Sequence, residues 1–419
     1  MLLASHFLPA DSSAGSTPGP QSIQLALQSV AGSSAPNLSR GADGIIILSW
    51  LEPSDQLTRL RFSRLTEAGW STPQTLAESD NWFVNWADFP SVVAISETLW
   101  AAHWLNKKSG GRYAYDVNIA LSRDAGMTWG TGITPHRDNT ATEHGFVSLF
   151  PWQQGLGAVW LDGRNTVAAN AAHAHDENLG AGGMTLRYAL ILPDGEITAE
   201  AELDSLVCDC CQTSVALARQ GPVAVYRNRT RDELRDIHIA RFVDGAWQAG
   251  QAVHLDGWKI SGCPVNGPAV AAAGDTVVVA WFTMADDIPR VRFARSEDGG
   301  KSFPQMLDIA ERTPAGRVDV ALLDDGSAAI SWLDEAAGNE AGTVVNIIRI
   351  RIIFPDGSLA ASHLLHGDKT VGPAGFPQMV SDGNDLILAW TEILQGASDK
   401  NSSIRSARIP PASLTQPDR

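Results

Sequence analysis

Short runs of β-branched and small apolar residues recur along the chain, and each run ends in Trp or Tyr. The seven runs end at Trp50, Trp104, Trp160, Tyr226, Trp281, Trp332 and Trp390, at intervals of 54, 56, 66, 55, 51 and 58 residues. Apolar and polar residues also alternate in the segments on either side, as in Pro90–Ile95 before Trp104 and Val117–Arg123 after it. Alternation with a period of two between Gly, Pro and Asp turns is typical of β-strands. No segment has a convincing helical period.

This repeat predicts an all-β fold, because three or four strands in each unit of 50–60 residues are typical of a β-propeller. We favour seven blades, with six blades and extra strands as the alternative. The seventh unit has no clear fourth strand after Ile409, whereas the alternating segment Ser22–Val30 belongs to no unit. We therefore expect the N-terminal segment to supply the missing outer strand and close the ring.

The predicted propeller domain spans residues 22–410. Residues 1–21 are expected to be flexible: Met1–Ala10 is either a trimmed export signal or a frayed end, and the Ser/Gly/Pro-rich stretch after it is typical of a linker. Residues 411–419 are expected to form a C-terminal tail.

Composition narrows the classes of ligand. Lys and Arg number 31 against 47 Asp and Glu, which gives a net charge of −16. Such an acidic chain repels phosphate backbones, so nucleic acid is not expected as the main partner. No apolar run is long enough for a transmembrane helix. We expect a monomer that binds a glycan or another small molecule.

Two turns between third and fourth strands share one motif, S-x-D-x-G-x-[ST]-[WF]. Its members are Ser122, Asp124, Gly126, Thr128 and Trp129 in one turn, and Ser296, Asp298, Gly300, Ser302 and Phe303 in the other. The motif matches the Asp-box, also called the BNR repeat, and the chain resembles the sialidase superfamily of Asp-box propellers, of a bacterial sialidase-like type with a Cys-Asp-Cys-Cys motif. The Asp accepts turn N–H groups and the Gly permits positive φ, so we expect both boxes to be structural.

The longest polar loops enter the first strand of a unit or leave its second strand, and in a propeller these loops share one face around the channel. Cys208, Cys210 and Cys211 enter unit 4 and Cys263 enters unit 5, so the four sulfurs are expected to cluster. Three interpretations stay open. The cysteines form disulfides, for which three pairings exist; they bind a soft metal such as copper or zinc, with His144 as an auxiliary ligand; or they are reactive thiols.

The resemblance implies converging arginines that bind a sugar carboxylate, a carboxylic general acid, and a Tyr nucleophile activated by Glu. The same face offers these residue types. Glu143, Asp162 and Tyr226 are the predicted catalytic residues, and Arg164, Arg227, Arg229, Arg317 and Tyr115 are the predicted substrate-binding residues. No motif assigns a Tyr–Glu pair, and no FRIP-like segment precedes the first blade, so the family's residues do not carry over one by one. The alternative for each Arg is a salt bridge to a neighbouring loop.

Three functions compete on this basis. The first is a carbohydrate-active propeller, an exo-α-sialidase-like glycoside hydrolase that acts on or binds an acidic glycan. The second is a metal-binding or redox propeller that uses the cysteine cluster. The third is a non-catalytic binding propeller. The resemblance also implies export to the periplasm or the extracellular space.

Overall fold

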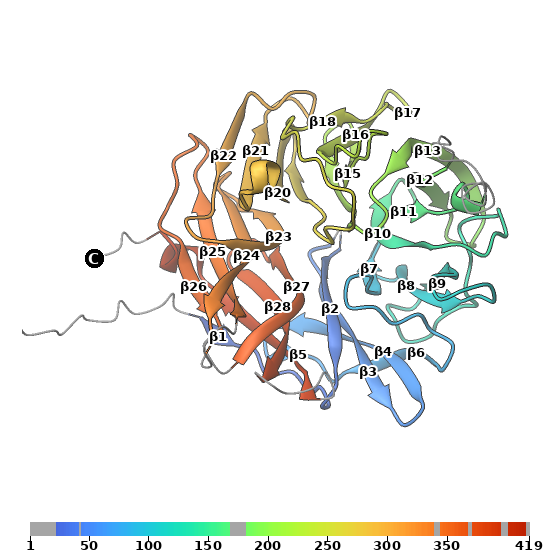
Figure 1. Cartoon of the computed structure of the whole chain (residues 1–419). Helices are drawn as coiled ribbons and strands as arrows, with labels where there is room; N and C mark the ends of the chain where they lie inside the picture. The colour runs from blue at the N-terminus through green and yellow to red at the C-terminus, as the bar shows by residue number, and fades with distance from the viewer. Residues whose placement is uncertain are drawn as a thin grey trace, which may run out of the picture.

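The computed structural model describes residues 22–41, 43–167, 182–338, 344–367, 371–394 and 401–415. The predicted flexible segment 1–21 and the last four residues of the predicted tail lie outside these ranges. Seven antiparallel sheets are arranged around a central axis (Figure 1). The all-β, seven-bladed propeller predicted from the repeat is confirmed.

Each blade runs from an inner strand beside the axis to an outer strand. The first two blades are blade 1, with β2 (Ser34–Arg40), β3 (Ile46–Ser54), β4 (Leu57–Thr66), β5 (Gly69–Trp70) and β6 (Gln74–Ser79), and blade 2, with β7 (Ser91–Ala94), β8 (Trp100–Lys107) and β9 (Tyr115–Ser122). The next two are blade 3, with β10 (His144–Trp152), β11 (Gly155–Asp162), β12 (Met184–Ile191) and β13 (Ile197–Val207), and blade 4, with β14 (Ser214–Ala218), β15 (Gly221–Arg227), β16 (Ile237–Val243), β17 (Ala246–Trp247) and β18 (Gln251–Ala252). The last three are blade 5, with β19 (Ala269–Ala273), β20 (Thr276–Thr283), β21 (Arg290–Ser296) and β22 (Gln305–Asp308), blade 6, with β23 (Pro314–Leu322), β24 (Ala328–Ala337), β25 (Val344–Ile353) and β26 (His363–His366), and blade 7, with β27 (Val371–Ser381), β28 (Leu386–Leu394) and β29 (Ser403–Ile409).

The N-terminal strand β1 (Ile23–Gln24) completes blade 7. It pairs antiparallel with β29, with Ile23 opposite Arg408 and Gln24 opposite Ala407. The first and last described segments of the chain therefore share one sheet, as predicted, and their pairing closes the ring.

The recurring aromatic residues all lie on the second strand of their blades. Trp50, Trp160, Trp281, Trp332 and Trp390 are at most 1% exposed, and so is Tyr226. In five blades the cross-strand partner of the Trp is an Arg on the third strand: Arg61, Arg187, Arg292, Arg349 and Arg405. Each buried indole removes about 200 Å² from water, which is worth about 5 kcal/mol. The periodic Trp residues are thus the core that packs neighbouring blades together.

The two turns with the shared motif have the same hydrogen bonds. In the second turn the Ser296 hydroxyl donates to Asp298 over 2.6 Å and accepts from the Gly300 N–H over 2.9 Å, while the Ser302 N–H donates to Asp298 over 2.9 Å. The first turn repeats this set through Ser122, Asp124, Gly126 and Thr128. The residues that the two turns share therefore hold the turn rather than a ligand.

Ser296→Ala is expected to lower the free energy of unfolding by about 1–2 kcal/mol, because the buried Gly300 N–H loses its acceptor. Denaturant unfolding measures this change. Ser302→Ala, at the exposed end of the same turn, is the matched control and should cost less. Equal stability of Ser296→Ala and the wild type would contradict a structural role for the motif.

The predicted C-terminal tail begins with a packed turn. The 3₁₀ turn η3 (Pro411–Ser413) is followed by Leu414, which is fully buried in a core cluster formed with blades 6 and 7.

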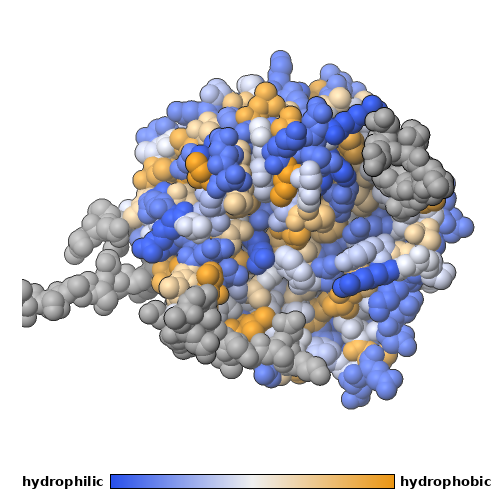
Figure 2. All heavy atoms as spheres, in the orientation of Figure 1, coloured by the Kyte–Doolittle hydropathy of each residue, from blue (hydrophilic) through white to orange (hydrophobic). Residues whose placement is uncertain are grey.

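Hydrophilic side chains are spread over the face seen in Figure 1, including around its centre (Figure 2). Within the described ranges, no helix is long and apolar enough to span a membrane.

Candidate active site

The loop that leads into β7 lies across the mouth of the central channel. The Ala87 carbonyl accepts a hydrogen bond of 2.6 Å from the Gln212 side chain at the start of blade 4. The Phe146 N–H of blade 3 donates to Asp88 over 2.8 Å, and the Trp86 ring stacks on Phe376 of blade 7 with centroids 5.8 Å apart. A single loop of blade 2 therefore contacts blades 3, 4 and 7.

Beneath this loop is a cavity of about 440 Å³, lined by the inner strands of all seven blades together with Ala87, Asp88 and Phe89. Two carboxyl groups, those of the buried Asp88 and the half-buried Asp319, belong to its wall. Burial raises the pKa of Asp319 to about 7, although the Met379 and Val320 N–H groups donate to it. The channel wall thus holds carboxyl groups that are only partly ionised near neutral pH.

A tyrosine hydroxyl connects two carboxyl groups at the edge of this cavity. Tyr115, the first residue of β9, donates to Glu143 Oε1 over 2.6 Å, and its hydroxyl lies 3.1 Å from Asp88 Oδ2. Tyr115 is fully buried and its ring stacks on Phe83 with centroids 4.1 Å apart, whereas Glu143 is half-buried. Glu143 is therefore the member of this trio that a ligand can reach.

The trio needs a proton beyond the one that Tyr115 carries. A phenol has one O–H group and can donate to one carboxylate only. The second contact is favourable when Asp88 is itself protonated and donates to the tyrosine oxygen. Burial raises the pKa of Asp88 to about 7, helped by the nearby charge of Glu143 and opposed by hydrogen bonds from Phe146 and Tyr115. With a pKa of about 7, Asp88 is protonated in a large share of molecules at neutral pH, and in that form it can donate to the tyrosine oxygen.

Glu143 is also a weak acid. Burial raises its pKa to about 7, the hydrogen bond from Tyr115 opposes the increase, and the charge of Asp209 adds to it. Asp162, the other predicted acid, behaves differently. Burial would raise its pKa, but hydrogen bonds from Arg164 and Trp160 and the proximity of His144 hold the pKa below its usual value. Of the two predicted acids, Glu143 is the one suited to donate a proton near neutral pH.

Three of the four predicted substrate-binding arginines are already paired. Arg164 binds Asp162 over 2.6 Å, and Arg229 contacts both Asp209 and Glu233. Arg227 is 1% exposed and donates to the carbonyl groups of Asn266, Arg235 and Phe282. Arg164 and Arg229 thus form ion pairs with carboxylates, whereas Arg227 binds backbone carbonyl groups, and these contacts leave no open clamp built from all three.

Arg317 is the exception. It has no carboxylate within ion-pair distance among the described residues, and its guanidinium lies 4.7 Å from the Trp86 ring centre and 5.7 Å from that of Phe376. Arg317 has φ of 53° at a bulge in β23, where the register shifts between Gly316 and Asp319. This conformation is strained for a residue with a side chain, and such bulges re-aim side chains beside functional sites. Arg317 and the half-exposed Trp86 thus lie together at the channel mouth.

Tyr226 lies elsewhere in the molecule. Its hydroxyl donates to Asp204 of β13 over 2.6 Å, and its ring belongs to the core between blades 3 and 4. Tyr115, rather than Tyr226, is the tyrosine whose hydroxyl is hydrogen-bonded to Glu143. Tyr226 was predicted to be catalytic, yet its place in the series of buried aromatic anchors was a signal for a core role.

His144 is surrounded by acidic side chains. Its ring stacks on His136 with centroids 3.8 Å apart, and its Nε2 lies 3.2 Å from Asp138 and 3.6 Å from Asp162. Two sets of side chains here have the ligand types and proximity for a metal ion: Asp116, His136 and His144, and Asp138, His144 and Asp162. Arg164 and Lys108 already balance part of the negative charge, with Lys108 3.2 Å from Asp116. His144 thus joins an ion-pair network at the start of blade 3.

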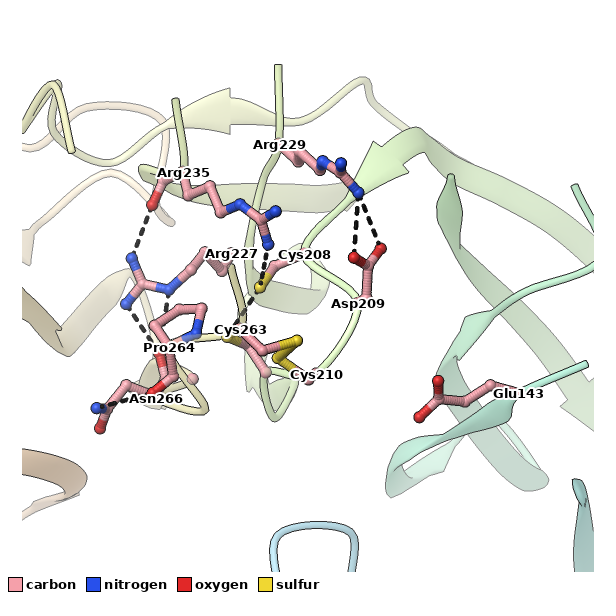
Figure 3. Close-up of a disulfide and its surroundings, with 12 residues drawn as sticks. Glu143, Cys208, Asp209, Cys210, Arg227, Arg229, Arg235, Cys263, Pro264 and Asn266 are labelled. Carbon is pink, nitrogen blue, oxygen red and sulfur yellow. Dashed lines mark hydrogen bonds and ion pairs between the residues drawn. A yellow bond between two sulfur atoms is a disulfide. The ribbon is translucent and has the colours of Figure 1, made fainter. Parts of the chain in front are cut away.

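The cysteines cluster as predicted, at the mouths of blades 4 and 5. Cys210 and Cys263 form a disulfide, one of the open interpretations (Figure 3). Cys208 and Cys211 are free and buried. The disulfide leaves two of the four sulfurs as thiols. The carboxyl group of Glu143 points toward this loop, which carries Asp209 between Cys208 and Cys210 (Figure 3).

Comparisons with known proteins concern the fold. No family model and no curated protein matches the chain. Among solved structures, an α-L-arabinofuranosidase of Fusarium graminearum is 12% identical with a TM-score of 0.48, covering 96% of this chain and 100% of its own. An α-L-arabinanase of Penicillium chrysogenum is 11% identical with a TM-score of 0.46, covering 95% and 99%. The NanB sialidase of Streptococcus pneumoniae is 11% identical with a TM-score of 0.46, covering 95% and 71%. Similarity at this level says nothing about the reaction.

Proposed function

We propose that the protein is a carbohydrate-active propeller that hydrolyses an acidic glycan at the mouth of its channel. The observation that carries the proposal is the Tyr115 hydroxyl between Glu143 and Asp88, 2.6 and 3.1 Å from their oxygens. Hydrolysis of a glycosidic bond requires a carboxylic acid that protonates the leaving oxygen, and a raised pKa suits this task at neutral pH.

In this proposal Glu143 is the general acid. When Glu143 is protonated, Tyr115 donates to Oε1 and the other carboxyl oxygen is free to present its proton to the glycosidic oxygen. After the transfer, the hydrogen bond from Tyr115 stabilises the new carboxylate. Asp88 then lies one hydrogen bond behind Tyr115, where its proton can pass through the phenol and restore the acid. Tyr115 and Asp88 are thus positioning residues, because Tyr115 is fully buried.

Arg317 and Trp86 provide the binding surface. An exposed indole stacks on the apolar face of a sugar ring, and a guanidinium without an acidic partner binds a carboxylate. The loop that carries Trp86 also carries Asp88, which is linked to Glu143 through the Tyr115 hydroxyl. Recognition by one arginine in place of three departs from the clamp that the sialidase resemblance implies.

A panel of sialosides, uronate-containing oligosaccharides and neutral glycosides tests this function. Release of reducing sugar and calorimetric binding are measured on the same samples. Turnover confined to carboxylate-bearing substrates supports the proposal. Binding without any turnover after long incubation supports a non-catalytic binding propeller, and the absence of both contradicts the carbohydrate hypothesis.

Arg317→Met is expected to weaken binding of the acidic glycan by about 10- to 100-fold, because a charge-assisted hydrogen bond of about 1.5–3 kcal/mol is lost. Binding of a neutral analogue should stay within twofold, since Met keeps the contact with Trp86. Arg59→Met, which breaks the exposed pair with Glu78 on blade 1, is the matched control. Equal loss for acidic and neutral ligands would show that Arg317 shapes the loop and binds no carboxylate.

We also propose that the protein is exported. Disulfides persist in oxidising compartments such as the periplasm or the extracellular space, and Cys210–Cys263 joins the loops of two blades.

A further inference from the structure

Cys208 and Cys211 form a close pair of thiols beside the disulfide. Their sulfurs lie 3.1 Å apart, and the residues are 1% and 2% exposed. They occupy the two ends of a Cys-x-x-Cys segment. The cysteine between them, Cys210, forms the disulfide with Cys263. The geometry of a disulfide requires a sulfur–sulfur distance of about 2.05 Å. A shortening of about 1 Å would therefore join the pair.

The surroundings of Cys208 are positively charged. Arg235 Nη1 donates to the sulfur over 3.2 Å (Figure 3). The same guanidinium is fixed by Glu233 over 2.7 Å. The Cys208 N–H donates to the Arg227 carbonyl over 2.9 Å, which brings a second buried arginine beside the pair. The hydrogen bond from Cys211 and the charges of Arg227 and Arg235 lower the pKa of Cys208 to about 6, against the effect of burial.

Cys211 has the opposite character. Burial and the neighbouring Cys208 raise its pKa well above the usual value. At neutral pH the pair therefore consists of a thiolate, Cys208, that accepts a hydrogen bond from a thiol, Cys211. This is the arrangement of an attacking sulfur and a resolving sulfur.

We propose that Cys208 and Cys211 are a redox-active dithiol that hydrogen peroxide, or another small peroxide, converts reversibly into a disulfide. The Cys208 thiolate attacks one peroxide oxygen, the O–O bond breaks, and a sulfenic acid and a hydroxide ion form. The Cys211 sulfur then attacks the sulfenic sulfur, the S–O bond breaks, and water leaves with the Cys211 proton. Two thiols are oxidised by two electrons, and one peroxide is reduced to two molecules of water once the hydroxide takes up a proton.

The structure favours this role over a metal site at the cysteines. A structural zinc site takes four ligands, but the disulfide leaves two sulfurs, and no His or carboxylate among the described residues groups with them. The guanidinium of Arg235 also already supplies positive charge to Cys208. Burial also restricts the oxidant to a small molecule, because the two residues are only 1% and 2% exposed. The competing interpretation is a permanent structural disulfide between the same two residues.

Counting thiols tests the proposal on the intact wild-type protein. The untreated protein should give two alkylated cysteines after denaturation, Cys208 and Cys211, and none with a bulky reagent while folded. Treatment with peroxide should make both thiols unavailable to the alkylating reagent, and peptide mapping should show the Cys208–Cys211 disulfide. A dithiol reductant should then restore both thiols without a change in the circular dichroism spectrum. A second disulfide that opens only on unfolding would overturn the proposal, as would two thiols that survive peroxide.

Variants separate the roles of the two sulfurs and of Arg235. Cys211→Ser should leave Cys208 as a sulfenic acid that dimedone traps, whereas Cys208→Ser should leave Cys211 unreactive. Arg235→Met should slow oxidation about tenfold, because less of Cys208 is thiolate, and Arg235→Lys should restore part of the rate. An unchanged rate in Arg235→Met would remove the arginine from the mechanism. None of these measurements depends on glycan turnover, so their failure would leave the proposed function untouched.

Discussion

Glu143→Gln is expected to lower kcat for the acidic glycan by about 10³-fold, within the range that general acid catalysis contributes. The amide keeps an oxygen that accepts from Tyr115 and preserves the shape of the side chain, but it has no proton to give to the leaving group. Kd for the same glycan should stay within about threefold, since binding depends on Arg317 and Trp86. Stopped assays of product release and calorimetry on the same variant measure the two quantities.

The pH profile gives a second signature of the same acid. With a pKa of about 7, Glu143 is protonated below neutral pH and loses its proton above it, so kcat should fall as the pH rises through about 7. Tyr115→Phe removes a hydrogen bond that lowers this pKa, so the fall should move to higher pH.

The control for this prediction is Glu202→Gln, on the outer strand of blade 3 in an exposed pair with Arg187, which should leave kcat unchanged. Full activity in Glu143→Gln combined with inactivity in Asp162→Asn would assign the acid to Asp162 instead.

The fold was predictable because its signals are local. One unit encodes the alternation within its strands, the aromatic residue at the end of its second strand and the turn residues between strands. The number of repeats therefore indicates the number of blades. Ring closure was predictable for a related reason. The chain had one strand too many at its start and one too few at its end, and β1 and β29 pair accordingly.

The site was only partly predictable, because it is built from residues of different blades. Tyr115 and Glu143 are 28 positions apart and Asp88 lies 27 before Tyr115, so no short motif joins them. Asp88 and Trp86 were visible only as members of a polar loop that enters blade 2. Sequence could also not separate the arginines, since Arg227, Arg229 and Arg235 share one charged run, yet Arg227 is the one enclosed by carbonyl groups.

Arg227→Met is expected to lower the free energy of unfolding by about 3–5 kcal/mol, the cost of leaving buried polar groups without partners. The Arg227 guanidinium fills a site between blades 4 and 5, where the carbonyl groups of Asn266, Arg235 and Phe282 accept from it over 2.7–3.1 Å. Its flat face lies 4.7 Å from the Trp258 ring centre. Met fills similar volume against Trp258, so the loss is confined to the hydrogen bonds.

Denaturant unfolding separates this role from the predicted one in substrate binding. The midpoint for Arg227→Met should fall without a change in the slope m, and Arg227→Lys should recover less than half of the loss because an ammonium group cannot reach all three carbonyl groups. Arg219→Met, which breaks an exposed pair with Asp275, should change stability by less than about 0.5 kcal/mol. Wild-type stability of Arg227→Met together with weaker binding of acidic glycans would return Arg227 to the carboxylate clamp.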